Sequence, residues 1–301
     1  LDSSAGENRV YMDGPIIIDS TDDGVPEILL DQPNTVLDII GDLTPDGIVD
    51  TYMVGLGYEI PTGEYVQITR GFGVNGNVEN PFRYYLNPNN EIAAYECFTM
   101  EVNGQLEVFI GSKPHVHDDG ISFAKRLYAA EGTTLDISVY LVAGGSYYLD
   151  GEGTFTVLKH PHIKKNTYLC LNGKDLQISQ IETAGTKDNP TEMVLCDCVG
   201  GSLINGGDSS YWQILAYNTL TFKGINFESD SDQDLGQFSV KGTMIIEDSV
   251  IDSAHLDRTL NMGDYGGKYI IRNSTILNTS DNPNKNGIAV DIEVPTVALS
   301  G

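Results

Sequence analysis

Two acidic loops of similar sequence are the first stretches whose side chains could bind a metal ion. Both read D-x-T-x-D-G-x-x-(D/E), and they begin 23 residues apart. Calcium takes about six to eight oxygen ligands, which a tight loop presents from alternate positions, and glycine permits the turn. The spacing predicts two weak calcium sites. Their ligands would be Asp19, Thr21, Asp23 and Glu27 in one loop and Asp42, Thr44, Asp46 and Asp50 in the other.

The loops resemble the short D-x-D-x-D-G-x-x-D calcium loops of several extracellular repeat families, with two departures. Threonine at the third position lowers the ligand charge, and the glutamate that closes an EF-hand loop is replaced by Leu30 and Met53. The alternative interpretation is a pair of Asp-Gly turns between strands, which needs no metal.

Two histidine pairs have a spacing that suits a metal site. His115 and His117 stand two residues apart, and so do His160 and His162. On a strand, such a pair points to one face and could share a metal with a nearby carboxylate. Four histidines brought together would form a zinc site. The alternative is exposed or singly hydrogen-bonded imidazoles.

A repeat near the carboxyl end of the chain predicts the elements that position these residues. Segments 218–229, 242–253 and 267–278 align, and each alternates apolar and polar residues around a polar or glycine step. Strands recurring at this period without intervening helices predict a right-handed parallel β-helix, whose aligned residues form interior ladders. The aligned columns are Leu220/Met244/Tyr269, Phe222/Ile246/Ile271 and Phe227/Ile251/Ile276.

The alternative fold is an antiparallel sandwich, which has no reason to repeat one twelve-residue pattern at a fixed period. The polar step also aligns Lys223, Glu247 and Arg272. An ion-pair ladder on the surface explains this column more simply than a catalytic cleft does.

The four cysteines can be placed on the same repeat. Cys170 and Cys196 are 26 residues apart, close to one coil, and are expected to be ladder neighbours. Buried reduced thiols are one interpretation, and a disulfide between coils is the other. Cys198 is expected to share a face with Cys196, and Cys97 lies far upstream.

The chain is expected to be all-β, with two domains. Residues 1–113 predict a smaller antiparallel sandwich or jelly-roll-like domain, in which Asn103-Gly104 makes a hairpin turn. Residues 114–301 predict the β-helix, with a cap over its first coil between Phe123 and Tyr140.

Charge narrows the possible partners. The chain has 301 residues, with 17 basic and 43 acidic side chains and a net charge of −26. The negative electrostatic potential of such a chain repels nucleic acid and anionic membranes. It also repels acidic polysaccharides unless a cation bridges them to the protein. No apolar run is long enough to span a membrane. The start at Leu1, without methionine, is interpreted as the beginning of a processed or excised piece of an exported protein.

Five segments follow one another along the chain: His117–Phe123, Ala143–Asp150, Tyr168–Ile178, Glu192–Cys198 and Gly201–Gly206. Their order resembles large surface-exposed bacterial proteins that carry parallel β-helix domains of the pectin-lyase-like superfamily. The resemblance covers roughly residues 115–206, whereas the later coils lack the usual glycine-rich repeats and the domain before His115 lies outside the pattern. It implies an exported, cell-surface protein and supplies no catalytic set.

These observations favour an extracellular structural or adhesive protein that self-assembles into fibres or binds glycans or a cell-surface partner. The alternative is a polysaccharide lyase or glycoside hydrolase, which would need a basic residue with calcium-holding carboxylates, or paired carboxylates. Basic residues are sparse along the coils, and most acidic residues of so acidic a chain are solvated. These features favour the structural or adhesive interpretation over the enzyme, which stays the alternative.

Overall fold

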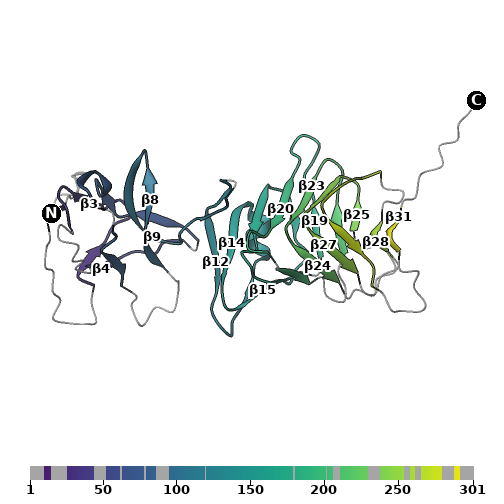
Figure 1. Ribbon diagram of the computed structural model, residues 1–301, viewed down its shortest axis with the longest axis horizontal. Coiled ribbons are helices and arrows are strands. Elements are labelled where there is room, and N and C mark those ends of the chain that lie inside the picture. The colour runs from purple at the N-terminus through teal and green to yellow at the C-terminus, as the bar shows by residue number, and fades with distance from the viewer. Residues whose placement is uncertain are drawn as a thin grey trace, which may run out of the picture. The chain divides into compact units, whose positions relative to one another are not determined.

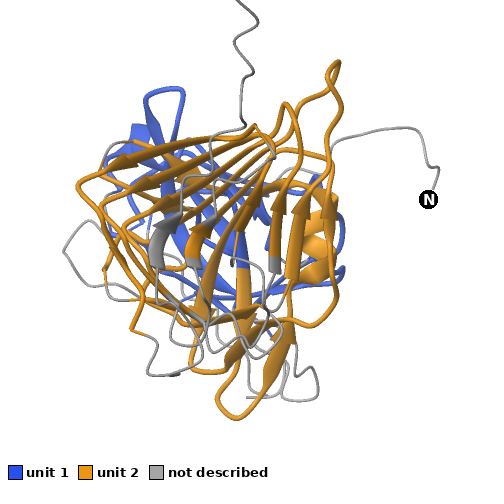
Figure 2. Cartoon of the chain, turned by 90° about the vertical axis from the view of Figure 1, so that its right-hand side faces the viewer, with its two compact units in different colours: residues 1–114, 124–126 blue, residues 115–123, 127–301 orange. Residues whose placement is uncertain are grey.

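The computed structural model describes residues 10–14, 26–43, 52–61, 63–77, 79–85, 95–118, 120–178, 180–200, 202–205, 211–229, 238–253, 258–261, 266–279 and 288–291. They form two compact units (Figures 1 and 2). One comprises residues 1–114 and 124–126, and the other residues 115–123 and 127–301. Among the described residues, no helix combines the length and hydrophobicity needed to cross a membrane.

The second unit is a parallel β-helix with three walls, as the repeat predicts. Figure 2 shows its parallel strands stacked side by side. The first wall contains β12 (Lys125–Ala129), β14 (Gly145–Gly151), β17 (Thr167–Cys170), β20 (Glu192–Cys196), β23 (Thr219–Lys223), β26 (Thr243–Glu247) and β29 (Lys268–Arg272).

The other two walls complete each coil. The second contains β13 (Thr134–Asp136), β15 (Thr154–Val157), β18 (Leu176–Ile178), β21 (Leu203–Asn205), β24 (Asn226–Ser229), β27 (Val250–Ser253) and β30 (Thr275–Leu277). The third contains β16 (His162–Ile163), β19 (Gln180–Thr183), β22 (Tyr211–Ile214), β25 (Phe238–Val240), β28 (Arg258–Asn261) and β31 (Ile288–Asp291).

The register of the strands confirms the predicted columns. Phe222 pairs with Ile246, and Ile246 with Ile271. The columns Leu220/Met244/Tyr269 and Phe227/Ile251/Ile276 stack in the same way. Phe222 and Ile246 are fully buried, whereas Ile271 is 41% exposed because, among the described strands, β29 is the last of its wall.

The polar step of the repeat forms the corner of the coil. Gly224, Asp248 and Asn273 follow the first-wall strands at equivalent positions and have φ angles of 69°, 50° and 47°. Asn172, at an earlier corner, has a φ of 50°. Glycine, asparagine and aspartate tolerate this left-handed conformation better than other residues do, so the polar step serves the backbone.

Aromatic rings fill the middle of the β-helix. Trp212 from the third wall contacts Phe222, Phe227 and Phe238, with ring centroids 5.4 to 5.9 Å apart. All four side chains are fully or almost fully buried. They join one continuous core that extends from Leu127 to Leu260, so hydrophobic burial holds successive coils together.

A short helix follows the first two strands of the first coil, and the stretch predicted as a cap, Phe123 to Tyr140, contains those strands, β12 and β13. α1 (Ser138–Ala143) follows β13, and its Leu141 is buried in the core. Asp136 accepts hydrogen bonds from the amide and hydroxyl of Ser138 and so fixes the start of the helix.

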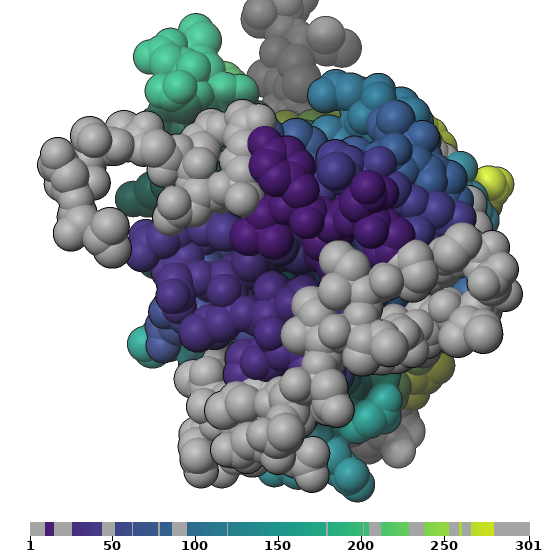
Figure 3. Space-filling view, turned by 90° about the vertical axis from the view of Figure 1, so that its left-hand side faces the viewer, coloured from purple at the N-terminus to yellow at the C-terminus, as the bar shows by residue number. Residues whose placement is uncertain are grey.

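The first unit contains two three-stranded parallel sheets. One contains β1 (Val10–Met12), β3 (Leu37–Ile39) and β6 (Thr69–Arg70), and the other β2 (Ile28–Leu30), β4 (Tyr52–Leu56) and β7 (Phe82–Tyr84). In the space-filling view of Figure 3, the purple surface belongs to the described residues nearest the N-terminus, which include β1, β2 and β3. Their side chains enclose a separate core that includes Leu37, Tyr52 and Phe82.

The third sheet of the first unit is antiparallel. It contains β5 (Tyr65–Gln67), β9 (Gln105–Gly111) and β8 (Glu96–Val102), and the 3-10 helix η1 (Gly73–Asn75) precedes β7. The hairpin at Asn103-Gly104 is confirmed. Antiparallel pairing does not extend to the other two sheets, because there each strand pairs with a strand about one coil further along the chain.

Candidate functional site

A short hairpin holds the first histidine pair. β10 (His115–Val116) pairs with β11 (Ser122–Phe123) in antiparallel register, so that His115 lies opposite Phe123. The amide of His117 donates to the carbonyl of Ile121 at 2.9 Å, and the amide of Gly120 donates to that of His117 at 2.9 Å. Gly120 has a φ of 82°, which glycine adopts without strain. The turn fixes the backbone beside His117.

The hairpin covers an apolar patch on the outer surface of the first wall. Tyr148, Cys170 and Cys196 stack there in successive coils, and Phe123 packs on them with 1% of its surface exposed. These residues point outward because the neighbouring Leu169 and Leu195 belong to the interior core. Burial of Phe123 therefore fastens the hairpin to the wall.

Cys198 comes from the turn after β20, and the carboxylate of Asp197 holds that turn. It accepts backbone hydrogen bonds from Gly173, Val199 and Ser202 at 2.9 to 3.1 Å. Partial burial raises the pKa of Asp197, but the hydrogen bonds, those from Ser202 foremost, outweigh this effect and lower the pKa. The ionised carboxylate thus fixes the backbone that follows Cys198 and ties this turn to the neighbouring coil.

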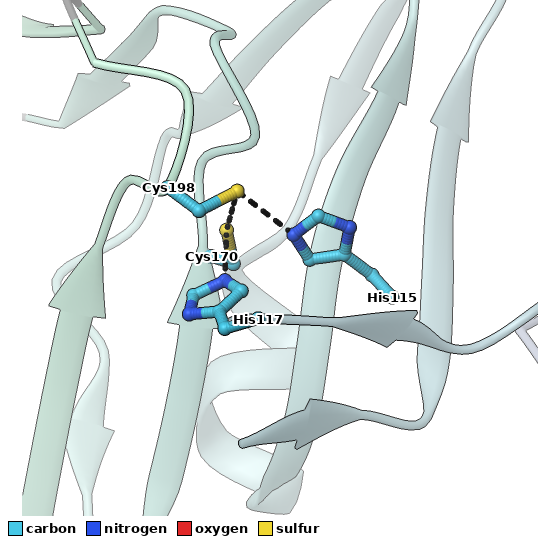
Figure 4. Close-up of side chains that lie close together, drawn as sticks. All are labelled: His115, His117, Cys170 and Cys198. Carbon is cyan, nitrogen blue, oxygen red and sulfur yellow. Dashed lines mark hydrogen bonds between the residues drawn. The ribbon is translucent and has the colours of Figure 1, made fainter. Parts of the chain in front are cut away.

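The four side chains converge on one point (Figure 4). His115 Nε2 lies 3.0 Å from Cys198 Sγ, and His117 Nε2 lies 3.1 Å from Cys170 Sγ. The two sulfur atoms are 3.8 Å apart. One nitrogen or sulfur atom from each residue lies within 4.8 Å of every other.

Aromatic neighbours fix the orientation of both imidazoles. The ring of His115 stacks on Tyr148, with centroids 5.2 Å apart and planes inclined by 29°. The ring of His117 lies 4.6 Å from that of Phe123. Both imidazoles are only partly exposed, whereas the thiol of Cys198 reaches solvent and that of Cys170 is buried. The cluster therefore has one open side.

The surroundings favour the neutral forms of Cys170, Cys198 and His115. The Cys196 thiol and burial raise the pKa of Cys170, and burial with the nearby Cys170 raises the pKa of Cys198 to about 12. Burial and His117 lower the pKa of His115. A reactive cysteine needs a stabilised thiolate, so these values do not favour nucleophilic catalysis.

The second histidine pair lies in different surroundings. The rings of His160 and His162 are stacked with centroids 5.0 Å apart, and His162 Nδ1 lies 2.7 Å from a carboxylate oxygen of Glu182. An open groove of about 510 Å³ runs beside them. It is lined by Ser138, Val139, Val142, Lys159, His160, Pro161, His162 and Lys164.

The structure does not gather four histidines. Within the described residues, the candidate ligand group joins His115 and His117 to Cys170 and Cys198, and neither His160 nor His162 belongs to it. The reason is that the two pairs are carried by different elements, the outer hairpin and a strand of the third wall.

Of the predictions about cysteine positions, one is confirmed and one is wrong. Cys170 and Cys196 are ladder neighbours, as their spacing predicts. All four cysteines are free thiols, and Cys97 belongs to β8 of the first unit. Cys198 does not share the strand face of Cys196, because β20 ends at Cys196 and the following turn redirects the chain.

Most of the predicted calcium ligands lie outside the described residues. This applies to Asp19, Thr21, Asp23, Thr44, Asp46 and Asp50. Of the other two, Glu27 accepts a hydrogen bond from the amide of Met53 at 2.8 Å, which ties the end of one loop to the next coil, and Asp42 has a polar partner. In chain order, the first loop falls between β1 and β2 and the second between β3 and β4.

The polar column of the first wall has the predicted register. Lys223 pairs with Glu247, and Glu247 with Arg272. Glu247 and Arg272 form an ion pair across neighbouring coils. These side chains therefore match the surface ladder that the sequence indicates.

Compared with known proteins, the chain matches no family model, no curated protein and no solved structure. By its fold and its site, the protein is a parallel β-helix with a histidine and cysteine cluster on its outer wall.

Sequence reasoning missed the link between the first histidine pair and the cysteines. The available signal was the spacing of about one coil between Cys170 and Cys198, which places two sulfur atoms near each other on adjacent coils. The position of the hairpin above them depends on the burial of Phe123, a contact between distant segments that no local pattern shows.

Proposed function

We propose that this chain is an extracellular structural and adhesive module that binds glycans without cleaving them. The observation that carries the proposal is the groove beside His160 and His162 in the wall of a regular β-helix. Successive coils bonded strand to strand make a rigid support, on which a fixed groove can present side chains to a partner.

The chemistry of the groove favours an anionic glycan. Lys159, Lys164 and Lys165 are three of the chain's 11 lysines and stand within seven residues. All three are exposed, as are both imidazoles of the pair. Carboxylate or sulfate groups would be attracted here and repelled by the acidic remainder of the protein, which would restrict binding to this region.

Apolar side chains complete the groove. Val139 and Val142 of α1 are 62% and 45% exposed and lie beside the lysines. Such side chains offer contact area to the C–H faces of sugar rings, while the lysines select the charge.

The test compares binding of sulfated, uronate-containing and neutral polysaccharides by the full chain. We expect binding to the acidic polymers alone, weakening as salt rises. The double substitution Lys159→Glu/Lys164→Glu should reduce affinity by at least about tenfold, because it removes two charge-assisted contacts. The control Lys187→Glu/Lys268→Glu makes the same change of net charge on exposed residues outside the groove.

Three results would contradict the proposal. Equal losses in both double variants would show that net charge, and not the groove, governs binding. Release of shortened or unsaturated sugars from any polysaccharide would favour the lyase or hydrolase alternative. Concentration-dependent fibres in electron micrographs, without glycan binding, would favour a purely structural subunit.

A further inference from the structure

The donor atoms of the His115, His117, Cys170 and Cys198 cluster have the spacing of a tetrahedral metal site. With Zn–S and Zn–N bonds of about 2.3 and 2.0 Å, a tetrahedron places two sulfurs about 3.8 Å apart and a sulfur about 3.5 Å from a nitrogen. The observed separations are 3.8 Å between sulfurs and 3.0 and 3.1 Å between sulfur and nitrogen. These three separations lie within about 0.5 Å of the tetrahedral values, and every other pair of ligand atoms is within 4.8 Å.

The ligand set selects the metal by its chemistry. Two thiolates and two imidazoles are soft and borderline donors that suit zinc, whereas calcium and magnesium require oxygen. Four protein ligands leave no open coordination position, so this arrangement corresponds to structural and not catalytic zinc sites.

A disulfide is the main chemical alternative for the same atoms. Sulfur atoms in a disulfide are about 2.05 Å apart, and its formation would leave both imidazoles without sulfur ligands. The two histidines instead approach one sulfur each, from the side opposite to the wall. A disulfide does not explain this convergence, but a shared ion does.

We propose that His115, His117, Cys170 and Cys198 bind one zinc ion, which clamps the β10–β11 hairpin to two successive coils of the β-helix. Binding releases one proton from each thiol, so both sulfurs bind as thiolates and both imidazoles bind in the neutral form. The ion links segments that lie far apart in the sequence, from His115 to Cys198, and closes long loops.

The packing around the cluster supports a site prepared before the metal arrives. Tyr148 and Phe123 hold the rings, and Asp197 holds the turn that carries Cys198. Groups that orient ligands in this way raise the affinity of a metal site. The clamp is independent of glycan binding, because none of its ligands lines the groove.

The test uses the full chain, reduced, treated with a chelator and then titrated with zinc or cobalt. We expect one ion per chain by elemental analysis, and a cobalt spectrum with thiolate charge-transfer bands and intense d–d bands of tetrahedral geometry. Competition with a chromophoric chelator should show zinc binding that an excess of calcium does not displace.

Variants locate the site. Cys198→Ser and His115→Ala should each weaken zinc binding by more than about 100-fold, beyond the loss caused by removing a group that only orients a ligand. Cys198 is exposed, so its substitution should leave the circular dichroism spectrum unchanged. The controls are Cys97→Ser and the double substitution His160→Ala/His162→Ala, which should retain the affinity of the original chain.

Three outcomes would overturn the proposal. The reduced chain could bind less than about half an equivalent of zinc at micromolar concentration. The ligand variants could bind as tightly as the controls. Lastly, mass spectrometry could show a Cys170–Cys198 disulfide in the chain purified without reductant, with no uptake of zinc once it is reduced.

Discussion

The two histidine pairs share a spacing and differ in everything around it. His115 and His117 lie above two cysteines and are held by aromatic rings, whereas His160 and His162 border an open groove with lysines and Glu182. Two-residue spacing on a strand puts both imidazoles on one face. What faces them is decided by the neighbouring coil, so the same motif supports a metal clamp in one place and a binding surface in the other.

Addition of zinc should give the largest difference in stability between variants of the two histidine pairs. If zinc binds only the folded β-helix, a free zinc concentration about 1,000 times the Kd adds about 4 kcal/mol to the free energy of unfolding. Thermal denaturation with zinc and with a chelator measures the shift. The shift should persist in His160→Ala/His162→Ala and vanish in Cys198→Ser; a similar shift in both variants would break the comparison.

Removal of the aromatic anchor should have the next largest effect. Phe123→Ala deletes a ring that is 1% exposed, and we expect a loss of about 3 kcal/mol, because a buried aromatic contact is replaced by a cavity. Urea denaturation checks this value. Val116→Ala on the same hairpin is the control, since Val116 is 61% exposed and should change stability by less than about 0.5 kcal/mol.

A smaller effect is expected at the helix that lines the groove. Asp136→Ala removes the acceptor for the buried Ser138 and should cost about 1 kcal/mol, as for the loss of a hydrogen bond. Partial burial raises the pKa of Asp136, but its hydrogen bonds with Ser138 and Leu158 and the charge of Lys159 together outweigh this and lower the pKa. Its stabilisation is therefore present above the ordinary carboxyl pKa of about 3.9 and is lost as pH falls through the lower folded value.

Acid titrations of the original chain and of Asp136→Ala measure this contribution to the free energy of unfolding. The difference in unfolding free energy between the original chain and Asp136→Ala should be constant near neutral pH and shrink below about pH 4. A difference that grows in acid would contradict the assignment, and zinc uptake at neutral pH should be the same in both proteins.

The smallest effect is expected at the second histidine pair itself. Glu182→Gln weakens the contact with His162, whose side chain is 54% exposed, and should cost less than about 1 kcal/mol. Glu152→Gln, which removes the exposed ion pair with Lys174, is the matched control. A loss above about 2 kcal/mol in Glu182→Gln alone would mean that this pair, too, is a structural clamp.

The coils of the β-helix were predictable because their signal is local and repeated. The columns through Phe222 and Phe227 and the left-handed corners at Asp248 and Asn273 follow from an aligned pattern. The parallel pairing of the first unit was not predictable in the same way. Strands of three residues, such as β1, carry too few alternating positions to reveal a period.

The metal cluster was predictable only in part. The spacing of His115 and His117 indicates two ligands on one face, and the coil length brings Cys170 next to Cys196. The final step, the turn that directs Cys198 toward the hairpin, depends on the three backbone amides that Asp197 collects. Such a contact is fixed by tertiary packing and has no sequence period.

The ladder register has a mechanical consequence. Each coil rests only on the coil before and the coil after it, so a chain pulled from its carboxyl end should peel away coil by coil. Where the zinc ion joins β17, the turn after β20 and the hairpin, peeling should halt until the ion is released. A force trace would then show a sawtooth ending in one tall peak, and a chelator would erase that peak alone.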